Sequence, residues 1–315
     1  MPSNHPTLGA LPARFRRERV LIVGCGDVGT RIARALQDKV RVLALTSQAQ
    51  RTGALRSQGI EPLLGNLDST ATLRRLAGIA TRVIHLAPPL AEGWVDSRTL
   101  ALLRVLRLRT APVSLVYGST SGVYGDCAGA WVDETRAVQA DTPRALRRAD
   151  AERSVRFFGR GTGVRASVMR IPGIYASDRE GGTPLLRLQK GTPVLLPEDD
   201  VYTNHIQADD LARACVLALW RGSPQRAYNV NDDTCLKMGD YFDLAADLYQ
   251  LPRPPRVARD SAKALLPVMM LSFMSESRRM VNRRMKQELG LRLRFPTVAQ
   301  GLAAPLAVAS IPASS

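Results

Sequence analysis

The chain has 315 residues, enough for one large α/β domain or for a domain with a small lobe. Its composition, 45% hydrophobic and 23% charged, is typical of a globular protein. The formal net charge of +16 raises the question of a nucleic-acid partner, but the arginines are scattered along the chain and no recognition motif accompanies them. We therefore expect no nucleic-acid partner and interpret the basic residues as solvated surface positions.

Two other classes of protein are disfavoured by the sequence. The longest apolar run, residues 264–274, contains a proline and is far shorter than the roughly 20 residues that span a bilayer, so we expect no membrane partner. The four cysteines form no CxxC pair and no spacing typical of a zinc site. We expect reduced thiols, no bound metal and a cytoplasmic location.

Short apolar segments alternate with helical patterns along most of the chain. Residues 20–23 are typical of a buried parallel strand, glycines follow, and apolar residues recur at helical spacing before a second strand candidate at 40–45. This order is a βαβ unit. Further strands are expected at 62–64, 83–87, 114–117, 166–170 and 228–230, and helices at 69–76, 100–108, 142–157, 209–220 and 276–289.

This alternation predicts an α/β fold with a doubly wound parallel sheet of the Rossmann type. After about residue 176, prolines interrupt the pattern, which indicates a second, smaller part. The predicted parts are a loose tail at 1–17, a dinucleotide-binding domain at 18–175 plus about 201–231, a smaller substrate-side lobe at 176–200 plus 232–302, and a loose tail at 303–315.

A glycine-rich loop follows the first strand, at residues 24–29 (GCGDVG). In such a loop the first glycine permits a tight turn, the second lets backbone approach a pyrophosphate, and the third lets helix and strand pack closely. The helix that follows offers free N–H groups and a partial positive charge. A turn without a ligand gives the same pattern, but the strand–turn–helix context favours a dinucleotide site. The predicted contacts are Gly24, Gly26, Asp27, Val28 and Gly29.

The end of the second strand bears on the choice of cofactor. NAD sites carry a carboxylate there for the ribose 2′-hydroxyl. This chain has Thr46 and Ser47 instead, no acid before Glu61, and Arg51 four residues after Ser47. Hydroxyls with a nearby arginine suit a 2′-phosphate, so we predict NADP rather than NAD. The alternative is that Arg51 is a solvated helix residue.

With these motifs the chain resembles the extended short-chain dehydrogenase/reductases, the NAD-dependent epimerase/dehydratase family, over residues 18–302. Segment 119–125 (STSGVYG) resembles the strand end that carries the family's catalytic hydroxyl, and segment 170–175 (RIPGIY) resembles the end of its sixth strand. The resemblance maps the hydroxyl to Thr120, with Ser121 as a near neighbour. It also implies a nicotinamide cofactor, with contacts at Asn66, Leu67, Asp68, Leu86, Ala87, Pro88, Arg148 and Pro172.

The chain departs from the family at the catalytic Tyr-x-x-x-Lys. Glu152 fits the glutamate that follows the lysine in the family, which places Arg148 at the lysine position and Arg144 at the tyrosine position. A phenol can transfer a substrate's proton, but an arginine side chain cannot be deprotonated in a protein. Tyr124 is the best replacement, although a tyrosine at a strand end is more often a packing residue.

We therefore predict an NADP-dependent oxidoreductase of an atypical extended type, acting on an unidentified small molecule. The loss of the tyrosine and lysine favours an alternative, a non-catalytic NAD(P)(H)-binding redox sensor. A nucleotide-sugar epimerase is a third reading, disfavoured by Gly173 where many epimerases carry asparagine. Arg278 and Arg279 on the last helix suit an anionic substrate, although a solvated polar face explains them equally well. The sequence leaves the oligomeric state open and is compatible with a homodimer.

Overall fold

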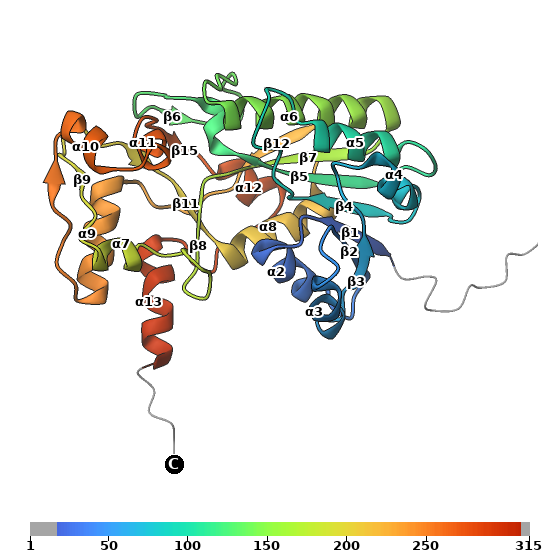
Figure 1. The fold of residues 1–315 in the computed structure, drawn as a ribbon, viewed down its shortest axis with the longest axis horizontal. Coiled ribbons are helices and arrows are strands. Elements are labelled where there is room, and N and C mark those ends of the chain that lie inside the picture. The colour runs from blue at the N-terminus through green and yellow to red at the C-terminus, as the bar shows by residue number, and fades with distance from the viewer. Residues whose placement is uncertain (1–17, 310–315) are drawn as a thin grey trace, which may run out of the picture.

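Seven parallel strands form the central sheet of the computed structural model, which describes residues 18–309. The chain winds from the middle of the sheet to one edge and then, beginning beside the first strand, to the other edge (Figure 1). This is the predicted doubly wound, Rossmann-type sheet. In spatial order the strands are β12 (Arg226–Asn229), β7 (Arg165–Ile171), β5 (Ser114–Thr120), β4 (Arg82–His85), β1 (Arg19–Val23), β2 (Arg41–Thr46) and β3 (Glu61–Leu64).

Helices cover both faces of this sheet (Figure 1). One face carries α2 (Asp27–Leu36), α3 (Arg51–Ser57) and α8 (Ala208–Arg221), and the other carries α4 (Thr70–Leu73), η1 (Arg74–Leu76), α5 (Ser97–Leu106) and α6 (Pro143–Thr162). In β1, Val20 and Ile22 belong to the core under α2 and α8, whereas Leu21 and Val23 belong to the core under α5 and α6. Both faces of the strand are buried, and this is why its sequence is continuously apolar.

Helix α6 carries Arg144 and Arg148, the residues that the resemblance aligns with the family's tyrosine and lysine. Thr142 caps its N-terminus by accepting a hydrogen bond from a backbone N–H (3.3 Å), and Pro143 occupies the first turn. The predicted start of this helix is confirmed. Because Arg144 and Arg148 are four residues apart, they lie on the same side of the helix on successive turns.

The other elements form a smaller lobe and its connections to the sheet. Helices α7 (Leu185–Gln189) and α9 (Met238–Tyr249) lie beside each other at the end of the molecule away from α3 and β3 (Figure 1). They share a third hydrophobic core with α10 (Arg259–Leu265) and α13 (Val298–Ala309). The elements are η2 (Ser121–Tyr124), β6 (Trp131–Val132), β8 (Gly173–Tyr175), α7 (Leu185–Gln189), β9 (Val194–Leu195), β10 (Tyr202–Thr203), β11 (His205–Gln207), β13 (Leu236–Lys237), α9 (Met238–Tyr249), β14 (Arg256–Val257), α10 (Arg259–Leu265), α11 (Val268–Phe273), β15 (Arg279–Met280), α12 (Arg283–Glu288) and α13 (Val298–Ala309).

Two expectations near the C-terminus are wrong. The helix predicted over 276–289 begins only at α12, because β15 pairs with β6 and the backbone N–H of Arg279 donates to the carbonyl of Ala130 (3.0 Å). The tail predicted from residue 303 is helical through Ala309, in α13, where Val298 and Leu302 are buried. The tail predicted at 1–17 lies outside the described residues.

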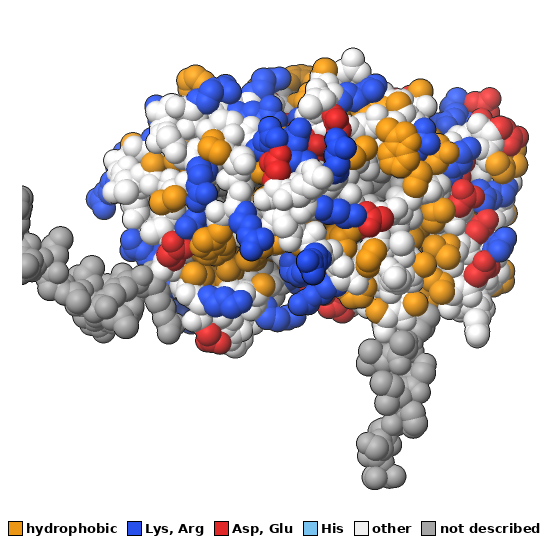
Figure 2. Space-filling model, turned by 180° about the vertical axis from the view of Figure 1, so that it is seen from behind, with side chains coloured by type: hydrophobic (Ala, Val, Ile, Leu, Met, Phe, Trp, Pro, Cys, Tyr) orange, Lys and Arg blue, Asp and Glu red, His pale blue; other side chains and the backbone are white. Residues whose placement is uncertain are grey.

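The surface carries the basic excess in dispersed form. On the face shown in Figure 2, lysine and arginine side chains are spread among neutral and apolar ones, with few acidic groups between them. Within residues 18–309 no helix combines the length and apolarity needed to cross a membrane.

Candidate functional site

Two cavities lie at the edge of the sheet where the strands end. The smaller one, of about 370 Å³, is bordered by the ends of β1 and β2 and is here called the glycine-loop cavity. The larger one, of about 820 Å³, is bordered by the end of β5 and by the small lobe and is here called the lobe cavity. Ligands of doubly wound sheets bind at this edge.

Most of the predicted cofactor contacts line the glycine-loop cavity. The exceptions include Asp68, which forms an ion pair with Arg98 (2.6 Å), and Pro172, which lines the lobe cavity. Asp27, Val28, Gly29 and Arg148 also lie outside its lining. Those that line it are Gly24, Gly26, Thr46, Ser47, Arg51, Asn66, Leu67, Leu86, Ala87 and Pro88.

The glycines have the geometry that a pyrophosphate needs. Gly24 has a φ of +91°, and a Cβ there would lie 2.3 Å from the backbone nitrogen of Ala87. A Cβ at Gly26 would meet no atom within 4 Å, so the space beside this residue is open. A Cβ on Gly29 would lie 3.0 Å from the carbonyl oxygen of Gly24, which explains the close packing of α2 on the loop. No side chain caps the N-terminus of α2, so the loop fits a dinucleotide's phosphates.

Arg51 is part of this cavity and not a solvated helix residue. Its Nη2 donates to the carbonyl oxygen of Cys25 in the glycine loop (2.7 Å), and its side chain is half-buried. The hydroxyl of Thr46 is held by the next turn, where it accepts a hydrogen bond from the backbone N–H of Gln48 (3.2 Å). Cys25, Gln48 and Arg98 also line the cavity, and our sequence reasoning missed them as cavity residues.

The side chain of Asp27 belongs to a network of ion pairs. Its carboxylate pairs with Arg31 (3.1 Å) and with Arg179 (2.8 Å). Arg31 also pairs with Asp178 (2.5 Å) and Asp209 (2.7 Å). This network joins the start of α2 to the loop that follows β8 and to α8.

Arg148 places a positive charge at the ends of β4 and β5. Its Nη1 donates to the carbonyl oxygen of Gly118 (2.8 Å) and to the hydroxyl of Tyr117 (3.1 Å). Burial, together with the charge of Arg148, lowers the pKa of His85 to about 3. His85 is fully buried, and its Nε2 lies 2.9 Å from the hydroxyl of Thr99, so it is a neutral core residue.

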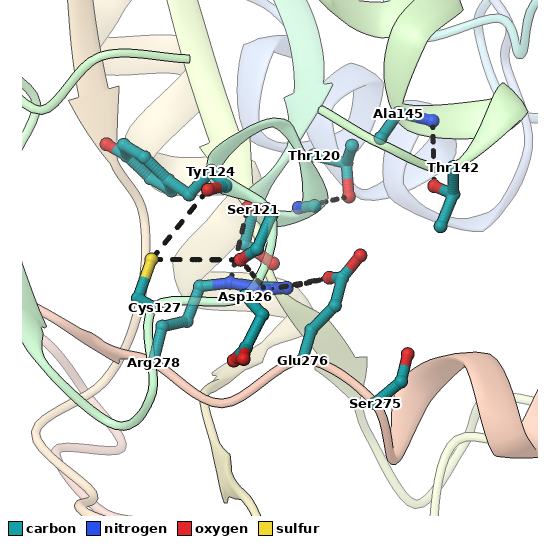
Figure 3. A network of polar contacts seen from close by, with 12 residues as sticks. Thr120, Ser121, Tyr124, Asp126, Cys127, Thr142, Ala145, Ser275, Glu276 and Arg278 are labelled. Atoms are coloured by element: carbon teal, nitrogen blue, oxygen red, sulfur yellow. Dashed lines mark hydrogen bonds and ion pairs between the residues drawn. The ribbon is translucent and has the colours of Figure 1, made fainter. Parts of the chain in front are cut away.

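Tyr124 is the predicted proton-transfer residue that the structure contradicts. Its side chain is fully buried, its hydroxyl donates to Oδ1 of Asn229 (2.7 Å), and the Arg170 guanidinium lies over its ring (4.7 Å). Burial raises the pKa of this phenol. Figure 3 shows the ring directed away from Thr120. Tyr124 is therefore a packing residue, and it lines neither cavity.

Thr120 and Ser121, by contrast, line the lobe cavity together with Arg144. The Oγ1 of Thr120 accepts a hydrogen bond from the backbone N–H of Gly122 (3.3 Å), which orients the side chain at the start of η2. The Arg144 guanidinium lies over the ring of Phe273 (5.4 Å). Arg144 thus contributes a cation to the lining of the lobe cavity.

Glu276 is a cavity-lining carboxylate that the sequence did not reveal. Its Oε2 accepts a hydrogen bond from Nη1 of Arg278 (2.8 Å), and the Nε of Arg278 donates to the carbonyl oxygen of Ser121 (3.4 Å). The side chain of Glu276 is 10% exposed, and burial raises the pKa of its carboxyl against the attraction of Arg278. Oε1 has no hydrogen-bond partner among the described residues, and Figure 3 shows it directed away from Arg278.

Two further features of the lobe cavity belong to β8 and β11. His205 is stacked on Tyr241 (centroids 4.2 Å apart), and burial lowers the pKa of His205 to about 4. Gly173 lies against His205, since a Cβ at Gly173 would be 3.4 Å from Cδ2 of His205.

Across residues 18–309, no group of three or more His, Cys, Asp or Glu side chains is arranged to hold a metal ion.

The sheet, its switch point and the glycine loop define a Rossmann-type α/β protein. The model of the NAD dependent epimerase/dehydratase family matches residues 20–231, and the chain belongs to this family. The resemblance inferred from the sequence is thereby confirmed. The comparison with curated proteins gives no match.

Several solved structures are similar to this one. A functionally unknown conserved protein from Silicibacter pomeroyi shares 30% sequence identity, with a TM-score of 0.78 over 93% of this chain and 100% of that chain. UDP-glucose 4-epimerase from Thermotoga maritima, solved with UDP-glucose, shares 16% identity, with a TM-score of 0.74 over 90% and 96% of the two chains. dTDP-glucose 4,6-dehydratase from Bacillus anthracis, in complex with NAD, shares 14% identity, with a TM-score of 0.74 over 92% and 96%.

Proposed function

We propose that the protein is an NADP-dependent oxidoreductase whose small-molecule substrate binds in the lobe cavity. The observation that carries the proposal is the glycine-loop cavity itself, with open space beside Gly26 and an uncapped helix N-terminus. Family membership supports a nicotinamide cofactor, and the similar dehydratase from Bacillus anthracis was solved with NAD. The preference for NADP rests on Arg51, which lines this cavity, and on the end of β2, where Thr46 and Ser47 stand in place of the acid of NAD sites.

A bound nicotinamide cofactor would supply or accept a hydride. The chain's own part is to hold the substrate and to move its proton. Thr120 and Ser121 present hydroxyls to the lobe cavity, and these suit the orientation of a substrate oxygen. Arg144 remains protonated, so it can attract an electron-rich substrate group but cannot serve as a base.

Glu276 is the group that we assign to proton transfer. It lines the same cavity as Thr120, one of its carboxylate oxygens has no partner among the described residues, and its pKa is raised toward neutrality by burial. As an acid it would give its O–H proton to the substrate oxygen, and as a base it would take the proton of a substrate hydroxyl. Arg278 holds the carboxylate in place through Oε2.

The test has a binding arm and a turnover arm. Calorimetry with NADP⁺ and NADPH should show binding to the parent and at least a tenfold loss, about 1.4 kcal/mol, in Gly26→Val, which fills the open space. Gly161→Val is the matched control, because Gly161 is also in open space but lies near the end of α6. Oxidation of NADPH should then be screened against aldehydes, ketones and sugar nucleotides.

The outcomes separate the candidate functions. Unchanged cofactor affinity in a folded Gly26→Val variant would refute the dinucleotide site. Tight binding of NADPH with no turnover on a broad panel would favour the redox sensor, which the arginine at position 144 supports. Isomerisation of a sugar nucleotide without net consumption of cofactor, followed by chromatography of the sugar, would favour the epimerase.

A further inference from the structure

Arg187, on α7, lines the lobe cavity without the partners that buried arginines normally have. Its guanidinium lies over the ring of Phe242 (4.2 Å), which covers one face of the group. Its Nε and Nη2 atoms are buried, and neither has a hydrogen-bond partner among the described residues. Buried donors left without acceptors destabilise a fold. The side chain is therefore held ready for an acceptor that the described chain does not provide.

The other arginines of the lobe cavity differ from Arg187. Arg179 pairs with Asp27 (2.8 Å), Arg278 with Glu276, and Arg147 donates to the carbonyl oxygen of Gly93 (2.8 Å). Arg144 lies over Phe273 on the side of Thr120 and is not fully enclosed. Nε of Arg147 is also buried without a partner, but the Nη1 of that side chain has the Gly93 acceptor. Of these five cavity arginines, Arg187 is the one whose guanidinium has buried N–H groups and no acceptor at all in the described chain.

Among the described residues, no carboxylate forms an ion pair with Arg187. His205 and Tyr241 line the same cavity, and both are neutral at pH 7, because burial lowers the pKa of the imidazole and raises that of the phenol. Burial also lowers the pKa of Arg187 itself. An ionised Tyr241 would raise that pKa, but the phenolate is not formed at neutral pH. A weakly hydrated cation with little charge compensation attracts an anion strongly.

We propose that Arg187 forms an anion subsite in the lobe cavity, for a carboxylate or phosphate group of a small organic substrate. The guanidinium fork presents paired N–H groups that match either anion. Arg187 and Phe242 belong to α7 and α9 of the small lobe, whereas Thr120 belongs to β5 of the sheet, so different parts of the fold supply the anion subsite and the hydroxyl (Figure 1). The assignment of the bound anion as the substrate rests on the proposed oxidoreductase function.

The subsite is tested by titrating the protein with two probes, succinate and inorganic phosphate, by calorimetry. NADP⁺ is kept saturating so that the glycine-loop cavity is filled, and ionic strength is kept constant because free charges are screened by salt. Arg187→Met retains apolar contact with Phe242 and removes the charge. Lys190→Met is the matched control, since it removes the same charge from an exposed position at the end of the same helix.

We expect at least one probe to bind the parent, with affinity unchanged in Lys190→Met and reduced tenfold to a hundredfold in Arg187→Met. Arg187→Lys should fall between them, because it keeps the charge but loses the fork. Binding of succinate alone identifies a carboxylate site, and binding of phosphate alone a phosphoryl site. Equal affinities in the parent and Arg187→Met, or no binding of either probe to the parent, would overturn the proposal.

Two further measurements keep the result independent of the cofactor. If Arg187→Met does not fold, the comparison of the parent with Arg187→Lys and Arg187→Gln carries the test. If NADP⁺ does not bind, the titrations are repeated in Arg51→Ala, which weakens phosphate binding near the glycine loop. Loss of anion binding on substitution of Arg187 in that background supports the subsite even where the proposed oxidoreductase function has failed.

Discussion

Replacing Arg51 with alanine tests the assignment of NADP. The guanidinium has five N–H donors, and one of them is engaged by the carbonyl oxygen of Cys25 (2.7 Å), which leaves the others for a 2′-phosphate. A charge-assisted hydrogen bond contributes roughly 1.5–3 kcal/mol. Because the side chain of Arg51 is only half-buried, solvent screening favours the lower part of this range, about a tenfold to thirtyfold loss of NADPH affinity.

The measurement is a calorimetric titration of parent and variant with NADPH and NADH at several salt concentrations. Affinity for NADH should change little, and the NADPH loss should shrink as salt increases. Arg56→Ala is the control, because Arg56 is an exposed arginine of the same helix. A parent that prefers NADH would refute the reasoning. An equal loss for both cofactors would show instead that Arg51 acts by holding the glycine loop through Cys25.

Three further substitutions address proton transfer and stability. Glu276→Gln should lower kcat roughly 10²–10⁴-fold and leave the affinity for NADPH unchanged. In the parent, the rate of carbonyl reduction should decline as pH rises through the raised pKa of Glu276, whose charged neighbours are Arg278, Asp141 and Arg144, and the variant should lack this decline. An unchanged pH profile in the variant would exclude Glu276 as the proton donor. Tyr124→Phe should keep its activity but lose roughly 1–3 kcal/mol of the free energy of unfolding, measured in urea, because the Oδ1 of Asn229 loses its hydrogen-bond donor. A large loss of kcat would instead show that Tyr124 takes part in proton transfer. Burial raises the pKa of Asp232 from 3.8 to about 7, so the folded state binds more protons across that window and the free energy of unfolding falls as pH rises through it. Asp232→Asn should flatten this fall, and a parent whose stability rises with pH there would contradict it.

The sequence was most informative where the chemistry is local. The turn at Gly24, the open space at Gly26 and the helix that begins after them lie within a few residues, so their spacing alone predicts the loop. The same holds for the start of α6 at Thr142. The continuous burial of β1 is also predicted by its own residues, because a central parallel strand is covered on both faces and is apolar throughout.

The lobe cavity could not be predicted because it depends on contacts between distant segments. Tyr124 is removed from the site by Asn229 of β12, which is 105 residues away in the chain. Glu276 reaches the cavity because the segment after α11 continues into β15, which pairs with β6, whereas the polar pattern alone suggested a solvated helix. Arg187 stands on a short helix with no motif around it, and only its burial distinguishes it from the many solvated arginines.

The choice between oxidoreductase and redox sensor turns on what the lobe cavity is for. A sensor requires the glycine-loop cavity and a surface that changes with the redox state of the cofactor, but it gains nothing from a second, larger cavity lined by oriented polar groups. This chain maintains such a cavity, with the hydroxyl of Thr120 at one end and the enclosed donors of Arg187 in the small lobe. It also places the carboxyl of Glu276 there, where burial makes ionisation costly. Buried groups of this kind reduce stability unless a ligand meets them, so their presence favours the enzyme over the sensor.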